Sequence, residues 1–363
     1  MVREKSIYAI LKYFVIFYFI LLLSSCNKNK PVTIISSSNI YEDTSNVYEW
    51  SRINVIGPFG IYAADTGHIY IFYGDDYAYM YNGINLEFQT VNFNDTKFRV
   101  NYAGGINNDN VFFVGEEYYN YNYYPPAIKK VRNGSVIASW IIYDDSLGSA
   151  GDVLVTGTDE TWIMQTNSPV IYHLNSGVIS RYKLEDSLNF IKMYKDKNSD
   201  IYAFGYLNSR DSGSFIYAFR FYGQKFDFIR KDSLSYFELD RYFHMFKCGI
   251  DMLMRSDSMG LLYFNGVQWT KYMDNPGIAI YNLGGDSKDK MICFAQLNGY
   301  PHPSAYIWNG KKWTNEKELE RLLMIELGYV DLGFDHMCLC GDYVYIQSMF
   351  NDASFLMIGK KKK

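Results

Sequence analysis

Three long loops of the sequence carry the side chains best suited to contact a ligand, and the first of these loops is rich in tyrosine. Tyrosine combines a rigid apolar ring with a hydroxyl group and loses little conformational entropy on binding, which suits contact with a sugar or a peptide. Residues 116–126 read EEYYNYNYYPP, and two more loops are expected at residues 206–213 and 296–303. The alternative is that these tyrosines pack against neighbouring strands, since the chain contains 35 of them. The side chains expected at a ligand surface are Tyr118, Tyr119, Tyr121, Tyr123, Tyr124, Arg210, Tyr300 and His302.

A second set of candidates is an acidic residue that returns at intervals along the chain. Three of its members begin the same tripeptide, Asp-Ser-Leu. A ring of carboxylates on one face would bind a cation or a basic partner. The alternative is that Asp and Ser cap a turn through their own backbone, and the sequence favours this, because a device repeated in every unit usually serves the unit itself. The members of this acidic ring are Asp95, Asp145, Asp186, Asp232 and Asp274.

Two motifs contain metal-ligand residue types, but neither completes a site. His336, Cys338 and Cys340 alternate along an apparent strand and so share one face, which suits zinc by ligand type. A second ligand pair is missing. Residues 196–200 have the spacing of the start of a calcium loop, but Ile201 replaces the glycine that such a loop needs. We therefore predict a hairpin turn at residues 196–200, and we expect neither a metal nor another cofactor.

Catalytic motifs give no support for an enzyme. The sequence contains no nucleophile elbow and no phosphate-binding glycine loop, and its five histidines are scattered. The sequence therefore favours a binding protein over an enzyme. The alternative is a glycan-acting hydrolase or lyase that uses acids such as Asp145 or Asp232, which requires two carboxyl groups about 5–10 Å apart in one pocket.

The N-terminal segment has the features of a bacterial export signal. Arg3, Lys5 and Lys12 precede an uncharged run over residues 13–23, which is shorter than the roughly 20 residues of a bilayer-spanning helix and within the range of a secretory leader. Leu23-Ser24-Ser25-Cys26 resembles the lipobox of bacterial lipoproteins. That resemblance implies that residues 1–25 are a signal peptide, that Cys26 is acylated, and that residues 26–45 tether the remainder, 46–363, to a membrane.

The residues after Cys26 indicate which membrane is expected. The next residue is Asn27 rather than the Asp that retains lipoproteins at the inner membrane in the enterobacterial pattern, and no acidic pair of the kind associated with surface export follows. A plain secretory leader with a chance cysteine is the alternative. The expected location is therefore the cell envelope, with the lipid in the outer membrane and the protein facing the periplasm.

Composition and cysteine content narrow the class of protein further. The chain has 35 basic and 39 acidic residues, a net charge of −4, and cleavage of the basic leader would make it more acidic. We therefore expect a monomer that does not bind nucleic acid. Four cysteines follow Cys26, and the sequence leaves their disulfide state open: Cys248, Cys293, Cys338 and Cys340.

A repeated unit determines the expected fold. Each copy has a turn rich in Asp, Asn or Gly, a β-rich strand, a variable loop, and a second strand that ends in a turn such as Asn-Gly. Corresponding strands begin near residues 68, 110, 160, 200, 251, 290 and 342, a mean step of about 46 residues, which is the length of one four-stranded propeller blade. The sequence predicts an all-β propeller of seven blades, with six blades as the alternative.

The last unit lacks its outer strand, and the start of the chain offers a replacement. Trp50-Ser51 resembles Trp269-Thr270 and Trp313-Thr314, which stand in the outer strands of other units. We expect residues 46–51 to pair with residues 354–359 as an antiparallel strand that closes the ring.

One unit, Asp200-Ile-Tyr-Ala-Phe-Gly205, resembles a kelch-type repeat, although that family places two glycines where this unit has Gly205-Tyr206. The chain is also similar to bacterial lipoproteins that combine a lipobox with a propeller of unassigned activity. These resemblances imply a membrane-anchored protein that binds a glycan, a peptide or an envelope protein.

Overall fold

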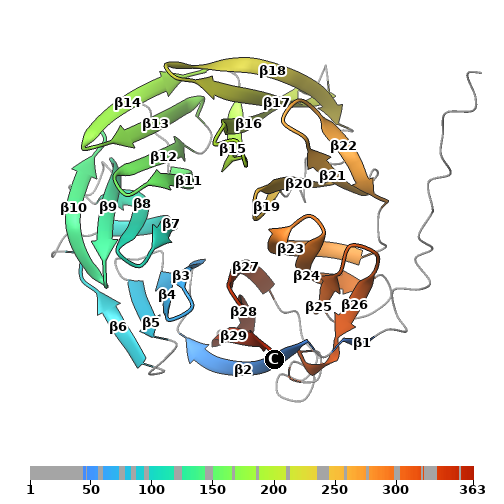
Figure 1. Ribbon diagram of the computed structural model, residues 1–363. Helices are drawn as coiled ribbons and strands as arrows, with labels where there is room; N and C mark the ends of the chain where they lie inside the picture. The colour runs from blue at the N-terminus through green and yellow to red at the C-terminus, as the bar shows by residue number, and fades with distance from the viewer. Residues whose placement is uncertain are drawn as a thin grey trace, which may run out of the picture. The chain divides into compact units, whose positions relative to one another are not determined.

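The computed structural model describes residues 44–45, 47–55, 60–72, 78–82, 87–93, 98–117, 125–143, 150–165, 168–184, 188–209, 213–234, 245–256, 260–274, 278–297, 303–319, 322, 333–350 and 353–363. Residues 38–363 form one compact unit. Within it the strands assemble into seven blades arranged around a central channel (Figure 1). The predicted all-β, seven-bladed propeller of four-stranded antiparallel blades is therefore confirmed.

Each blade has four antiparallel strands, named here from the channel outward. The inner strands are β3 (Gly60–Asp65), β7 (Phe98–Asn107), β11 (Ala150–Gly157), β15 (Asn189–Lys195), β19 (Met245–Cys248), β23 (Ile278–Ser287) and β27 (Gly333–Cys340). The second strands are β4 (His68–Phe72), β8 (Asn110–Glu117), β12 (Glu160–Gln165), β16 (Ile201–Ser209), β20 (Asp251–Ser256), β24 (Lys290–Leu297) and β28 (Tyr343–Phe350).

The two remaining strands of each blade lie toward the outside of the ring. The third strands are β5 (Ala78–Asn82), β9 (Pro126–Arg132), β13 (Val170–Asn175), β17 (Gly213–Tyr222), β21 (Gly260–Phe264), β25 (Pro303–Trp308) and β29 (Ala353–Lys361). The outer strands are β6 (Glu87–Val91), β10 (Ser135–Ile141), β14 (Val178–Lys183), β18 (Lys225–Leu234), β22 (Trp269–Met273), β26 (Trp313–Glu316) and, in the seventh blade, β2 (Tyr48–Val55).

The second strands begin where the repeat predicts them. Their first residues are 68, 110, 160, 201, 251, 290 and 343, within one residue of the expected positions. Side chains of a strand alternate between the two faces of its sheet, and each blade is covered on both faces by neighbours. The second strands are accordingly apolar in their central residues, as in β8, where Val111, Phe112, Phe113 and Val114 are all fully buried.

The hydrophobic core is divided into seven clusters, one at each interface between adjacent blades. The inner strands also contact one another in sequence around the channel, and β27 of the last blade contacts β3 of the first. Each blade therefore packs against two neighbours, and the last blade packs against the first. Stability therefore depends on closing the circle as well as on the individual blades.

Closure uses a strand borrowed from the N-terminal end of the ring, as predicted. Strand β2 pairs antiparallel with β29 from Tyr48↔Lys361 to Val55↔Ser354, so the partner strands are those expected, whereas β2 begins at Tyr48 rather than residue 46 and Ser51 pairs with Ile358. Trp50 lies opposite Gly359, and a Cβ atom at residue 359 would stand only 2.8 Å from the Trp50 ring. The glycine thus leaves the space in which the tryptophan packs.

A second contact holds the closing segment and has no counterpart in the sequence prediction. Strand β1 (Thr44–Ser45) pairs parallel with β26 of the sixth blade, inside the segment that the sequence assigns to the tether. The buried Glu316 carboxylate then accepts hydrogen bonds from the backbone N–H groups of Val47 (3.0 Å) and Tyr48 (3.3 Å). These bonds direct the chain from the sixth blade into the seventh.

One long loop of the prediction is instead mostly strand. The sequence places a loop at residues 206–213, whereas β16 extends to Ser209 and β17 begins at Gly213, with Tyr206↔Ile216 and Ser209↔Gly213 in register. Leu207 and Phe215 explain the difference, because their side chains pack against the cluster between the third and fourth blades. Burial of these apolar groups favours continuing the ladder.

A histidine packed between the third and fourth blades makes stability depend on pH. His173 stacks on Trp162 with ring centroids 3.7 Å apart, and its Nε2 lies 3.0 Å from Glu160 Oε1. Burial lowers the pKa of His173 and outweighs the opposing effect of Glu160. The folded protein therefore binds fewer protons here than the unfolded chain, whose histidine pKa is about 6.5.

We expect the contribution of His173 to be complete above about pH 6.5 and to decline as the pH falls below this value toward the folded-state pKa. Urea unfolding at pH 7.5 and pH 5.0 measures the decline, and H173F should reduce the difference between the two pH values. An equal difference in wild type and variant would contradict this assignment.

Candidate functional site

A polar residue stands at the same register position in five of the seven inner strands. Each of these residues pairs with the fifth residue of the adjacent second strand, as in Asp152↔Met164, except Lys192, which pairs with Phe204, the fourth residue of β16. In each case a β-bulge lies immediately before it. Bulges bend a strand and redirect its side chains. The members of this layer are Tyr102, Asp152, Lys192, Asn282 and His336.

The strongest interaction in the layer joins the third and fourth blades. The Asp152 side chain is buried, its Oδ1 lies 3.1 Å from Lys192 Nζ, and its Oδ2 accepts a hydrogen bond of 2.9 Å from the Met193 backbone N–H. The charge of Asp152 raises the pKa of Lys192. Burial raises the pKa of Tyr102, and the neighbouring Asp152 carboxylate adds to this effect. Asp152 therefore acts as the fixed anion around which the other groups are arranged.

Two more lysines line the channel closer to the inner hairpin turns. Lys195 pairs with Ile201, and Lys247 pairs with Met252 on the neighbouring fifth blade. Lys247 is exposed to solvent, and on an inner strand that solvent is the water of the channel. Protein on several sides nevertheless reduces its hydration, so the pKa of Lys247 is lowered, mainly by this desolvation and further by the charges of Lys192 and Lys195.

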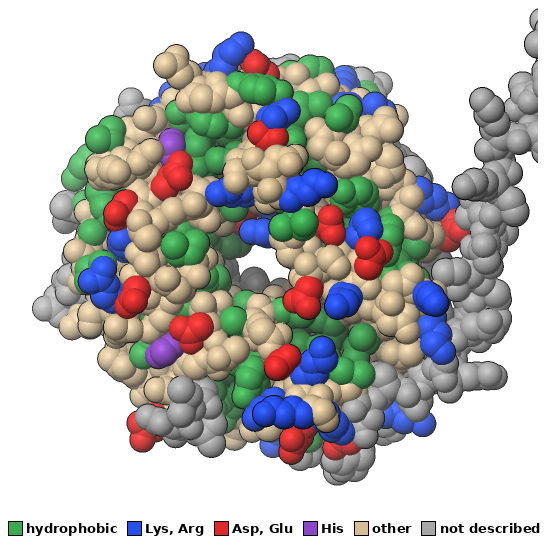
Figure 2. All heavy atoms as spheres, in the orientation of Figure 1, with side chains coloured by type: hydrophobic (Ala, Val, Ile, Leu, Met, Phe, Trp, Pro, Cys, Tyr) green, Lys and Arg blue, Asp and Glu red, His purple; other side chains and the backbone are tan. Residues whose placement is uncertain are grey.

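We call Tyr102, Asp152, Lys192, Lys195 and Lys247 the channel cluster. It contains three lysines and one carboxylate, so it is positively charged within a chain whose net charge is −4. Figure 2 shows the opening at the centre of the ring, with basic side chains along part of its edge. Sequence reasoning missed this cluster. An alignment of the inner strands could have found Tyr102, Asp152 and Lys192, which share one column, but not Lys195 and Lys247, which stand at other positions.

The antiparallel order of the strands gives the ring two distinct faces. The links between blades and the loops joining second to third strands emerge on one side, which we call the link face. The turns that join first to second and third to fourth strands emerge on the other, the turn face. The strand ends that flank the longest predicted tyrosine loop, Glu117 of β8 and Pro126 of β9, lie on the link face.

The predicted ligand residues of the long loops lie outside the described residues, as does the lipidation candidate Cys26. The ends of the loops are described for the second and sixth blades, where β8 ends at Glu117 and β9 begins at Pro126, and β24 ends at Leu297 and β25 begins at Pro303. Positions that remain untested predictions are Tyr118, Tyr119, Tyr121, Tyr123, Tyr124, Arg210, Tyr300 and His302.

Two members of the predicted acidic ring are described, and both are paired with a basic side chain nearby in sequence. Asp232 lies inside outer strand β18 rather than in a link, and its Oδ1 is 2.6 Å from Arg230 Nε. Asp274 directly follows β22 and forms an ion pair with Lys271. Asp232 is thus placed on the outside of the ring, away from the channel that a hydrolase site would use. Asp95, Asp145 and Asp186 lie outside the described residues.

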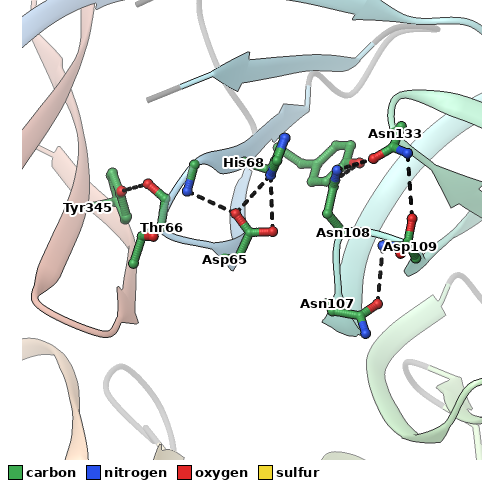
Figure 3. A network of polar contacts seen from close by, with 10 residues as sticks. Asp65, Thr66, His68, Asn107, Asn108, Asp109, Asn133 and Tyr345 are labelled. Atoms are coloured by element: carbon green, nitrogen blue, oxygen red, sulfur yellow. Dashed lines mark hydrogen bonds and ion pairs between the residues drawn. The ribbon is translucent and has the colours of Figure 1, made fainter. Parts of the chain in front are cut away.

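Polar residues on the turn face serve the hairpins. Asp65 Oδ1 accepts a hydrogen bond from the Gly67 backbone N–H (2.8 Å) and lies 2.8 Å from His68 Nδ1, as Figure 3 shows. In the next blade Asn108 accepts a hydrogen bond from the Tyr70 hydroxyl (2.6 Å) and donates one to Asn133 Oδ1 (2.5 Å). These contacts satisfy turn backbone and buried hydroxyl groups, which assigns the network to folding.

The two metal-like motifs also have structural roles. Asp196 Oδ1 accepts hydrogen bonds from the backbone N–H groups of Asn198 (2.8 Å) and Asp200 (2.9 Å), which confirms the predicted turn. Cys338 Sγ accepts one from the Ala63 backbone N–H (3.1 Å), across the joint between the last and first blades. Within the described part of the chain, no three His, Cys, Asp or Glu residues are grouped to hold a metal ion.

Comparison with known proteins shows the fold. No family model and no curated protein matches the sequence. Among solved structures, YCF48 bound to D1 peptide is 14% identical over 88% of this chain and 98% of that chain, with a TM-score of 0.58. The Pan2 WD40 domain of Neurospora crassa is 8% identical over 88% and 98%, with a TM-score of 0.59. The Doa1 WD40 propeller is 8% identical over 88% and 97%, with a TM-score of 0.52. At these identities the likeness places the chain among β-propellers by fold alone.

Proposed function

We propose that this protein is a membrane-anchored binding protein of the cell envelope, whose propeller holds a peptide or protein segment at the link face and in the channel. The observation that carries the proposal is the channel cluster. The interfaces between blades are apolar, whereas the inner strands of the third, fourth and fifth blades carry charged groups. A charged channel lining contributes little to packing and suits recognition of a polar partner.

Two further observations support this function. YCF48 shares the propeller fold, and its structure contains a bound peptide. The sequence between β8 and β9, two strands whose adjoining ends lie on the link face, contains five tyrosines, and rigid aromatic side chains suit peptide contact. Under this proposal the tyrosine loop contacts the partner around the channel entrance, and the kelch-like repeats serve as the scaffold.

The anchor is the second part of the proposal and rests on the sequence Leu23-Ser24-Ser25-Cys26. Acylation of Cys26 would hold the propeller at the outer membrane, facing the periplasm, because multiple acyl chains bind a bilayer stably where one does not. Within the described residues, no helix has the length and apolar character needed to cross a membrane.

Site-specific photocrosslinking in cells tests the binding function. A photoreactive phenylalanine analogue replaces Tyr121, in the sequence between β8 and β9, and in a matched control it replaces Tyr222, which is 50% exposed at the turn-face end of β17. We expect a crosslinked polypeptide from position 121 and none from position 222. Equal labelling at both positions, or no adduct at position 121, would reject the link face as the binding surface.

The same cells test the anchor. C26S is introduced into the protein that carries the photoreactive residue at position 121. We expect this variant to leave the membrane fraction. If the partner is membrane-bound, the amount of crosslinked adduct should decrease as well. Retention of C26S in the outer-membrane fraction would show that Cys26 is not the attachment point, whatever the crosslinking result.

A further inference from the structure

The channel cluster has more positive than negative side chains, and packing of the blades does not require this excess. Lys192 is paired with Asp152, whereas Lys195 and Lys247 add two positive charges. Among the described residues, the carboxylate whose charge acts on Lys247 is that of Asp152, which already contacts Lys192 and the Met193 backbone. One carboxylate therefore faces three ammonium groups.

We propose that the channel cluster is a binding site for an oxyanion, either a carboxylate or a phosphate group, held between Lys192, Lys195 and Lys247. This site rests on the proposed function in one respect. The group that enters the channel would be an acidic residue of the bound peptide or protein segment. Tyr102, on the second blade, is close enough to both groups that the Asp152 charge raises its pKa and the Lys192 charge lowers it. Its hydroxyl group would be an additional hydrogen-bond donor to the anion.

The geometry favours an anion over other ligands. The lysines come from β15 and β19, the inner strands of adjacent blades, so a single small group in the channel can be reached from two sides. Like charges held together in a partly desolvated channel repel one another, and a bound anion relieves that repulsion. Charge-assisted hydrogen bonds from ammonium groups to a carboxylate or phosphate are about twice as strong as neutral ones.

Among the described residues, Lys195 and Lys247 form no ion pair of the kind that Lys192 and other lysines of this protein form. Lys130 reaches Asp159 at 2.7 Å across the joint between the second and third blades, and Lys129 lies next to the buried Glu117. Lys247, by contrast, projects from an inner strand into solvent, and the charges that act most strongly on it after Asp152 are those of two other lysines. Such an arrangement destabilises the free protein slightly and favours ligand binding.

Calorimetric titration of the full-length protein in detergent tests the site. Sodium phosphate and a hexaglutamate peptide are titrated separately at constant ionic strength, and a hexaglutamine peptide is the uncharged comparison. We expect saturable binding near one equivalent for at least one of the two anions and none for hexaglutamine. The anion that binds more tightly identifies the source of the oxyanion.

Two double variants with equal charge change assign the binding to the channel. K195Q/K247Q should weaken anion binding at least tenfold, whereas K290Q/K311Q, which alters two exposed lysines near turns of the sixth blade, should leave it within about twofold. D152N, with its fold verified by circular dichroism, should tighten binding, because it removes the competing carboxylate. No saturable binding of either anion, or equal weakening in both double variants, overturns the proposal.

The outcomes separate this inference from the function on which it rests. If phosphate binds in a K247-dependent manner while position 121 yields no crosslinked polypeptide, the anion site stands and the scaffold function fails. If position 121 crosslinks a polypeptide equally well in wild type and in K195Q/K247Q, and neither anion binds, the scaffold function stands and the anion site is rejected.

Discussion

W50A is expected to lower the free energy of unfolding by about 3–5 kcal/mol, the usual range for removing a buried tryptophan. Trp50 is 7% exposed and packs in the cluster between the sixth and seventh blades. It lies opposite Gly359 of β29, the strand with which the closing strand β2 pairs. Its loss leaves a cavity at the joint of the ring, so the closing strand β2 should also become more accessible to protease. Urea denaturation and limited proteolysis measure the two effects.

A neighbouring substitution on the same strand provides the control. Glu49 is exposed, so E49A should change stability by no more than about 0.5 kcal/mol and leave the proteolysis pattern unchanged. The importance of the closing strand would be refuted if W50A and E49A unfolded at the same urea concentration.

K129M should destabilise the protein by a similar amount, about 3–5 kcal/mol, for a different physical reason. The Lys129 and Glu117 side chains are only 2% and 7% exposed, and Lys129 Nζ lies 3.5 Å from Glu117 Oε1. Burial lowers the pKa of Lys129 despite the attraction of Glu117, which shows how strongly the site is desolvated. Glu117 Oε2 is buried without a hydrogen-bond partner, so removing the lysine leaves a buried carboxylate with little compensation.

A double variant separates loss of the pair from loss of packing. In E117M/K129M both charges are absent and apolar side chains of similar length fill the space, so most of the lost stability should return. The exposed pair Lys225–Asp227 supplies the matched comparison, and K225M should cost at most about 1 kcal/mol. If E117M/K129M were as unstable as the sum of the two single variants, the burial argument would be wrong.

The candidate site shows where local patterns are insufficient. Tyr102, Asp152 and Lys192 are unremarkable in the sequence, because each lies in a different repeat at about 40 to 50 residues from the next. The bulge that precedes each of them sets which way its side chain is directed, and the alternation of apolar residues does not encode it. Their convergence follows from the circular arrangement of the blades.

Asp232 shows a second limit of local patterns, because a shared tripeptide does not fix where a residue lies. Asp232 was assigned to a link because it precedes Ser-Leu like two other members, yet β18 extends through it to Leu234 and Arg230 neutralises it. A ladder of backbone hydrogen bonds with β17 outweighs the turn preference of Asp and Ser in this blade.

By itself the sequence determined the strands, the seven repeats and the strand that closes the ring, because alternating burial and turn residues act over a few neighbours and recur with each blade. The tertiary structure alone decided the hydrogen bonds of Glu316 to the closing segment, the extension of β16 and β17, and the contact of Lys192 with Asp152 across two blades. These depend on groups that are far apart in the chain and become adjacent only when the blades close into a circle.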